Sequence, residues 1–251
     1  MSSYNLKRLL QPKSIALFGG LWIENVANQI KNSNFKGNVW PINPHRKSIA
    51  GYKCFQDISD LPGVPDTAFI GVNRTKTLEI LTKLNEVGCG GATCFAAGFS
   101  EVDKYGKQLQ KKLSKASKDM PFLGPNCYGY INYLDHIHMW PDQHGGKEVE
   151  KGVTIIAQSS NIAINLTMNT RSTPIAYVLT TGNQAKIDMS DLGLAMINDK
   201  RVTAIGIYIE GFKDIKKFEK MAFSALRSNI PIVVLKSGKT DLSKKQSFSH
   251  T

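Results

Sequence analysis

The chain has 251 residues, a hydrophobic content of 41% and a formal net charge of +12. This length allows one large hydrophobic core or two medium ones. Its apolar runs fall short of the roughly 18 residues that a membrane span needs, and the N-terminal stretch MSSYNLKRLLQPK lacks the apolar segment of a signal peptide. We therefore expect a cytoplasmic globular protein with no membrane partner.

The positive charge comes mainly from lysine, with 26 Lys and 6 Arg. A basic face can bind nucleic acid, but base-edge and bidentate phosphate recognition favour arginine. The densest run, KQLQKKLSKASK (107–118), surrounds one helix whose inward stripe is Leu109 and Leu113. This predicts a solvated helix face and no nucleic-acid partner, while the charge also suits a small polyanionic ligand.

The cysteines, which are Cys54, Cys89, Cys94 and Cys127, form neither a CxxC pair nor a metal-ligand spacing. This usage indicates free thiols in a reducing compartment, without a disulfide framework.

In the first half of the chain, short apolar runs alternate with segments of helical spacing. The runs that predict strands are SIALFG (14–19), NVWPIN (38–43), DTAFIGV (66–72), GATCFA (91–96) and PFLG (121–124), and helices are predicted at 24–32, 75–88 and 103–118. Strands that are apolar on both faces imply a parallel sheet covered by helices on each side. We therefore predict a doubly wound α/β domain.

This alternation breaks around residues 125–150, where the sequence is irregular and aromatic. We place a first domain at 1–132, a junction at 133–150 and a second α/β domain at 151–251. Strands in the second domain are predicted at 152–158, 174–181, 202–210 and 231–236, the last one buried, with helices at 160–170, 188–199 and 216–228. A flavodoxin-like sheet has about five strands, so the second domain is expected to be incomplete.

In doubly wound sheets, ligands bind beyond the carboxyl ends of the strands. In the first domain these ends carry GGLW, NPHRK, NRTK, AAGFSE and GPNCYG. Gly19 and Gly20 would let backbone N–H groups approach a phosphate. A third glycine and a ribose-binding acid are missing, and Arg46 and Lys47 stand where that acid would be. The pattern favours a nucleotide-like polyanion over plain NAD.

In the second domain, QSSN (158–161) opens a helix. It is either an ordinary N-cap or an anion site built from free N–H groups. Glu210 ends an apolar strand, where a carboxylate needs a partner. His250, in the segment that follows the neighbouring strand, is a candidate for that partner.

The segment HIHMWPDQH (136–144) contains residue types that can bind a metal ion. His136 and His138 would share one face of an extended segment, with Asp142 and His144 nearby. The same composition suits a junction loop that lines a pocket. We expect no metal site.

Several segments together closely resemble the nucleoside-diphosphate-forming acyl-CoA synthetases. They are LLQPKSIALFGG, GATCFAAGFSE, LGPNCYGYIN, the TTGNQ to IEGFKD block, KSGKT and SHT. This family includes the ADP-forming acetate–CoA ligases and the succinyl-CoA synthetase alpha subunit. The resemblance spans nearly the whole chain. It implies a Rossmann-like CoA-binding domain followed by a flavodoxin-like, succinyl-CoA-synthetase-like domain.

The resemblance also implies a reaction and its residues. Phosphate attacks an acyl-CoA to give an acyl phosphate, a histidine takes the phosphoryl group, and an ATP-grasp module passes it to ADP with Mg; the reverse reaction activates a small carboxylic acid. By residue-to-residue matching, His250 is the phosphohistidine and Glu210 its hydrogen-bonding carboxylate. The matching residues for CoA are Gly19, Gly20, Arg46, Val72, Asn73, Ala97 and Gly98, and those for the acyl group and phosphate are Asn126, Cys127, Ser159 and Ser160.

The family continues beyond SHT, so we expect that this chain needs an ATP-grasp subunit or domain and that it ends in a frayed tail from about Lys239. Two alternatives remain. One is a non-catalytic CoA-sensing module, although His250 and Glu210 are both kept. The other is an NAD-dependent oxidoreductase, which the missing third glycine and ribose-binding acid disfavour.

Overall fold

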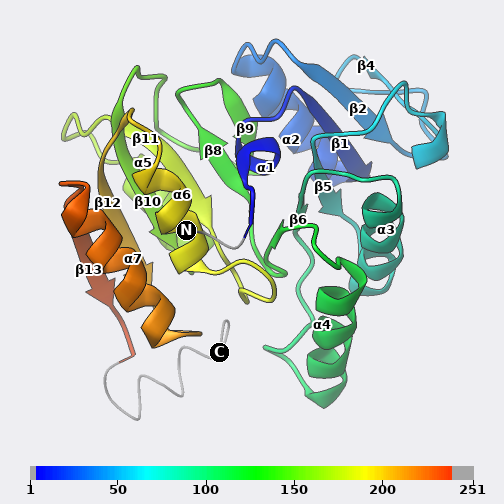
Figure 1. Cartoon of the computed structure of the whole chain (residues 1–251). Coiled ribbons are helices and arrows are strands. Elements are labelled where there is room, and N and C mark those ends of the chain that lie inside the picture. Colours follow the sequence, from blue (N-terminus) through cyan, green and yellow to red (C-terminus); the bar gives the residue numbers. More distant parts are fainter. Residues whose placement is uncertain (1–3, 239–251) are drawn as a thin grey trace.

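The computed structural model describes residues 4–238. These residues form two α/β halves side by side, the first at the right of Figure 1 and the second at the left. The first half contains α1 (Lys7–Leu10), β1 (Ser14–Gly19), α2 (Leu21–Asn32), β2 (Asn38–Ile42), β3 (Ser48–Ile49), β4 (Tyr52–Lys53), η1 (Ile58–Asp60), β5 (Thr67–Gly71), α3 (Arg74–Glu86), β6 (Ala92–Cys94), α4 (Lys104–Ala116) and β7 (Phe122–Leu123).

The first sheet has the order β2-β1-β5-β6-β7, and all of its pairings are parallel. Side chains alternate along β1: Ile15 and Leu17 face a core shared with α2, whereas Ala16 faces a core shared with α3 and α4. Leu109 and Leu113 form the buried stripe of α4, as predicted. The doubly wound parallel sheet predicted for this half is therefore confirmed.

The second half contains β8 (Tyr130–Asn132), β9 (Ile137–Met139), β10 (Gly152–Ala157), α5 (Ser160–Thr167), β11 (Ile175–Thr180), α6 (Met189–Ile197), β12 (Val202–Ile209), α7 (Ile215–Arg227) and β13 (Ile232–Lys236). Its sheet has the order β13-β12-β10-β11-β8-β9, and β10 to β13 are parallel. Helices α6 and α7 cover one face and α5 the other (Figure 1). The four predicted parallel strands are present.

Two features differ from the expectations. Strands β8 and β9 occupy a stretch that was expected to be irregular, and they extend the second sheet in antiparallel fashion. They were missed because each is only three residues long and each contains a polar residue, Asn132 or His138. Strand β13 was expected to be buried, but Val233 and Leu235 are 70% and 64% exposed because β13 is an edge strand of the sheet described here.

The N-terminal segment joins the two halves. The backbone carbonyl of Leu9 accepts a hydrogen bond from the Tyr130 hydroxyl, and the carbonyl of Leu10 accepts one from Asn132 Nδ2 at 3.1 Å. One hydrophobic cluster runs from α1 and α2 to strands β10 and β11 of the second half. The halves therefore pack through a continuous core.

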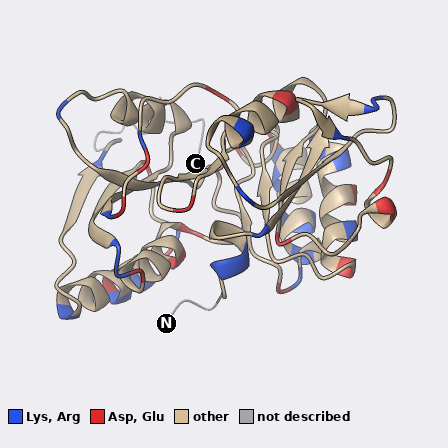
Figure 2. Ribbon diagram, turned by 90° about the horizontal axis from the view of Figure 1, so that it is seen from above, with Lys and Arg blue, Asp and Glu red and all other residues tan. Residues whose placement is uncertain are grey.

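Over residues 4–238, no helix is both long and apolar enough to cross a membrane. Basic and acidic residues are interspersed along the outer helices of both halves (Figure 2).

Candidate functional site

A crevice opens where the strand order of the first sheet reverses, between β1 and β5. The two strand ends approach closely, since a Cβ on Gly19 would lie 2.6 Å from the carbonyl oxygen of Gly71. Beyond them lies a cavity of about 390 Å³, lined by Phe18, Gly19, Gly20, Ile42, Asn43, Pro44, His45, Gln56, Asp57, Ile58, Val72, Lys76, Ile80 and Lys83. Its position is the usual ligand site of a doubly wound sheet.

The cavity lining is largely apolar and carries three basic residues against one acidic residue, Asp57, which suits a nucleotide bearing phosphates. Of the predicted residues, Gly19, Gly20 and Val72 line it. His45, Lys76 and Lys83 also line it. His45 and Lys76 belong to the NPHRK and NRTK motifs but were not named as site residues, and Lys83 lies outside every motif. The spacing of the two lysines by seven residues on α3, which puts them on one helix face, was the available signal. Lys83 pairs with Asp57 at 2.9 Å and lowers the pKa of that carboxyl.

Other predicted CoA residues have structural contacts of their own. Arg46 Nη1 lies 2.7 Å from Glu24 Oε2 on α2 and does not line the cavity. The Asn73 side chain caps α3 by accepting from the N–H of Lys76 at 3.0 Å.

The AAGFSE loop is held by its own glutamate. Gly98, at φ +96°, donates its N–H to Glu101 Oε1 at 2.6 Å, and its carbonyl accepts from Arg74 Nη1 at 2.5 Å. Ala97, beside it, is exposed. The Glu101 carboxylate also accepts from Asn183 Nδ2 at 2.5 Å, so this loop is tied to the TTGNQ loop of the second half.

The GPNC loop packs against TTGNQ through backbone contacts. The N–H of Asn183 donates to the carbonyl of Pro125 at 2.9 Å. Gly182 has φ +51°, and a Cβ there would lie 2.4 Å from the carbonyl oxygens of Pro125 and Asn126. Only glycine fits this contact. Cys127 is buried and burial raises the pKa of its thiol to about 12, so it is no thiolate nucleophile.

The GPNC loop also reaches the start of α5. Ser159 is the N-cap residue, and its side chain makes no capping hydrogen bond within the described chain. Ser160 Oγ accepts from the N–H of Tyr128 at 3.2 Å. Asn126, Cys127, Ser159 and Ser160, which the sequence placed in two separate motifs, therefore belong to neighbouring segments.

The second sheet has its own reversal point, between β10 and β12. Gln158 follows β10, and its Oε1 accepts from the N–H groups of Glu210 and Gly211, at 2.8 and 3.0 Å. Lys236 Nζ donates to the Glu210 carbonyl at 2.6 Å. Glu210 Oε2 is buried without a hydrogen-bond partner among residues 4–238, and burial raises the pKa of this carboxyl against the opposing effect of Lys236.

His250 and the tail predicted to fray from Lys239 lie outside the described residues.

Two histidines of the 136–144 segment, His138 and His144, pack against Tyr133. Its hydroxyl lies 2.9 Å from His144 Nδ1, and the rings of His138 and His144 are 4.7 Å apart. Residues 4–238 contain no group of three or more His, Cys, Asp or Glu side chains placed to hold a metal ion.

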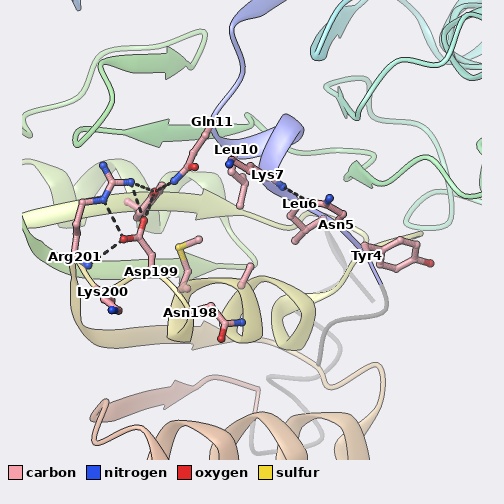
Figure 3. Close-up of a pocket in the computed structure, with 13 residues that line it drawn as sticks. Tyr4, Asn5, Leu6, Lys7, Leu10, Gln11, Asn198, Asp199, Lys200 and Arg201 are labelled. Atoms are coloured by element: carbon pink, nitrogen blue, oxygen red, sulfur yellow. Dashed lines mark hydrogen bonds and ion pairs between the residues drawn. The ribbon is translucent and has the colours of Figure 1, made fainter.

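A further cavity of about 510 Å³ lies at the amino-terminal ends of the strands of the second sheet, between α1 and the end of α6 (Figure 3). Here Arg201 pairs with Asp135 at 2.7 Å and with Asp199 at 2.9 Å. Both carboxylates keep lowered pKa values, despite partial burial, because they bond to Arg201. This network fixes the amino end of β12 and lies away from the strand ends that carry the motifs.

Comparison with known proteins agrees with the two-domain architecture. Residues 13–133 match the model of the CoA binding domain, and residues 150–251 match that of the succinyl-CoA ligase like flavodoxin domain. The fold and these matches define a CoA-binding domain joined to a succinyl-CoA ligase like flavodoxin domain. The chain belongs to the nucleoside-diphosphate-forming acyl-CoA synthetase family, in which the ADP-forming acetate–CoA ligases are its relatives.

Three of these relatives illustrate the similarity. The chain is 34% identical to the ADP-forming acetate–CoA ligase of Methanocaldococcus jannaschii, over 99% of this chain and 35% of that protein. It is 28% identical to the alpha subunit of the ADP-forming acetate–CoA ligase II of Pyrococcus furiosus, over 98% of this chain and 55% of that subunit. The apo form of dinucleotide forming acetyl-coenzyme A synthetase 1 from Ca. Korarchaeum cryptofilum superposes with a TM-score of 0.87 at 28% identity, over 98% of this chain and 56% of that one. The chain thus spans only about a third to a half of these relatives.

Proposed function

We propose that this chain is the CoA-binding, phosphohistidine-bearing part of an ADP-forming acyl-CoA synthetase. An ATP-grasp module on another chain or segment then exchanges the phosphoryl group with ADP. The cavity beside Gly19 and Gly20 takes the CoA nucleotide, with Lys76 and Lys83 facing its phosphates.

In the proposed reaction, a phosphate oxygen attacks the thioester carbonyl, and the CoA thiol leaves with a proton. The resulting acyl phosphate is attacked at phosphorus by a nitrogen of His250, which releases the carboxylate. ADP then takes the phosphoryl group from the histidine. The sum is acyl-CoA, ADP and phosphate giving acid, CoA and ATP, and the same steps run in reverse.

The Glu210 carboxylate is the observation that carries this proposal. Its backbone is fixed by Gln158 and Lys236, yet Oε2 is buried with no hydrogen-bond partner among the described residues. A buried carboxylate oxygen without a partner is costly and calls for a donor. An imidazole N–H supplies one, and the carboxylate then fixes the tautomer and leaves the other ring nitrogen nucleophilic.

Release of CoA thiol tests the proposal. The chain is mixed with its ATP-grasp partner, ADP and a panel of acyl-CoA thioesters, with and without phosphate. We expect phosphate-dependent turnover that is lost in His250→Ala, while the affinity for CoA is kept. Binding of CoA without phosphate-dependent release from any thioester would identify a sensing module and overturn the proposal.

A further inference from the structure

The end of strand β13 places a lysine beside Glu210. In the parallel pairing of β12 with β13, Lys236 lies opposite Ile209, the residue before Glu210. The Lys236 Nζ donates to the Glu210 carbonyl at 2.6 Å and also to the carbonyl of Ser237. The ammonium group therefore lies at the carboxyl edge of the second sheet, next to the residue that we assign to the phosphohistidine.

Further contacts hold this end of β13 in place. The N–H of Ser237 donates to the Ile209 carbonyl at 2.9 Å, and the Tyr208 hydroxyl donates to Ser237 Oγ at 3.1 Å. All of these atoms belong to β12 or to the residue that follows β13. The sheet itself therefore sets the position of Lys236.

The ammonium and the carboxylate are neighbours that do not form an ion pair. Among residues 4–238, Lys236 donates only to the two carbonyls, and Glu210 Oε2 is buried without a hydrogen-bond partner. The positive charge still acts on the carboxylate, since burial raises the pKa of the Glu210 carboxyl and Lys236 lowers it. No second charged residue of the described chain contributes to this balance.

This arrangement suits a carboxylate that must accept a hydrogen bond. A direct ion pair would occupy a carboxylate oxygen that the imidazole N–H needs. Without a nearby cation, a buried carboxylate takes up a proton more readily, and the protonated oxygen then donates instead of accepting. Because backbone carbonyls hold the ammonium, Lys236 supplies positive charge and leaves Glu210 Oε2 open.

We propose that Lys236 is a positioning residue of the phosphohistidine site, which fixes the Glu210 backbone and supplies the positive charge that keeps its carboxylate able to accept from the imidazole. This rests on the proposed function. Loss of the Lys236 charge should matter most at acidic pH, where the Glu210 carboxylate is closest to taking up a proton. Loss of a purely structural lysine would slow the reaction equally at every pH.

The pH profile of phosphate-dependent thiol release tests this inference. The assay contains the full chain, its ATP-grasp partner, ADP, phosphate and the thioester of the panel that the wild type cleaves fastest. Lys236→Met should move the acid limb of the profile to higher pH by about one unit, which is roughly a tenfold loss of rate on that limb. Lys236→Arg, which keeps the charge, should retain the acid limb of the wild type. Lys220→Met, at an exposed lysine of α7, is the matched control and should behave as the wild type does.

The two levels of the account fail differently. Absence of phosphate-dependent release by the wild type with every thioester would overturn the proposed function and, with it, this role of Lys236. Turnover by the wild type with an unmoved acid limb in Lys236→Met, or with the same shift in Lys236→Arg, would overturn only the role of Lys236.

A second variant covers the case in which Lys236→Met folds poorly, which weakened CoA binding would reveal. Lys236→Gln keeps an N–H donor for the backbone carbonyls but lacks the charge. A shifted acid limb in Lys236→Gln supports the inference, and an unmoved one contradicts it.

Discussion

Gln158 holds the backbone of Glu210 across the reversal point of the second sheet. Its Oε1 accepts from the N–H of Glu210 at 2.8 Å and from that of Gly211 at 3.0 Å. Gln158 is 3% exposed, so water cannot replace it. One buried side chain thus fixes the position of the carboxylate that we assign to the phosphohistidine.

Removing this acceptor should both destabilise the chain and impair phosphorylation. Gln158→Met keeps the volume but leaves two backbone donors unsatisfied, and we expect a loss of about 1–3 kcal/mol in the free energy of unfolding. Urea titration measures it. Gln108→Met, at an exposed position on α4, is the control and should be neutral. Equal stability of the two variants would contradict the role of Gln158.

The raised pKa of Glu210 sets the sign of a pH effect. Burial raises this pKa above 4.5, so the native state binds the proton more tightly than the unfolded state does. The stabilisation by protonation is complete below the unfolded pKa and is lost as pH rises through the folded pKa. In His250→Ala, which lacks the proposed imidazole donor, adding Glu210→Gln should therefore raise the melting temperature at neutral pH and not at about pH 4. A double variant that melts below His250→Ala at neutral pH would show that the carboxylate is stabilised in its charged form.

His138 should give the opposite dependence. Burial, followed by the nearby His144 and His136, lowers its pKa from 6.5 to about 3, even though Glu148 Oε1 lies 3.8 Å away. Stability from the neutral ring is present above the unfolded pKa and is lost as pH falls from 6.5 towards 3. His138→Phe should unfold less readily in acid, relative to its own stability at neutral pH, than the wild type. His45→Gln, at an exposed position outside this cluster, is the control. An identical acid profile for His138→Phe and wild type would refute the prediction.

Gly182 is the critical glycine of the contact between the halves. Gly182→Ala adds a Cβ 2.4 Å from two backbone carbonyl oxygens and keeps φ at +51°. We expect it to cost at least about 1–2 kcal/mol of stability, since the left-handed conformation alone costs that much. Thermal unfolding of Gly182→Ala and of Gly63→Ala, where the new Cβ meets only ordinary contact at 3.8 Å, measures the difference. Similar melting temperatures would argue against the tight contact.

Lys76 should contribute to CoA affinity through charge. Lys76→Gln is expected to weaken CoA binding about threefold to tenfold at low salt, and by less as salt screens the phosphates. Lys36→Gln, outside the cavity lining, is the control. Calorimetry at two ionic strengths measures both, and a salt-independent or absent effect of Lys76→Gln would remove it from the site.

The apolar runs predicted most of the fold because they were long and bounded by glycine or proline. SIALFG became β1 at residues 14–19, as predicted, and VTAIGIYIE became β12 within one residue. Strands β8 and β9 could not be predicted in this way. Their place in the second sheet depends on distant contacts, such as that of Asn132 with Leu10, which local periodicity does not record.

The candidate site was predictable to a similar degree. The glycines and strand-end motifs indicated the right edge of each sheet, because parallel strands bring their carboxyl ends together. Gln158 and Glu101 were not recognised as positioning residues, since their role depends on which loops meet in space. The pairing of Arg46 with Glu24 was likewise hidden, because 22 residues separate the two in sequence.

Transfer of phosphate to His250 tests the central claim most directly. The chain, its ATP-grasp partner, an acyl-CoA and radiolabelled phosphate are incubated without ADP, and the labelled peptide is identified by mass spectrometry. We predict an acid-labile label on the peptide that contains His250, absent in His250→Ala and strongly reduced in Glu210→Gln. Absence of label from the wild-type chain with every acyl-CoA tested, or the same label in His250→Ala, would contradict the account.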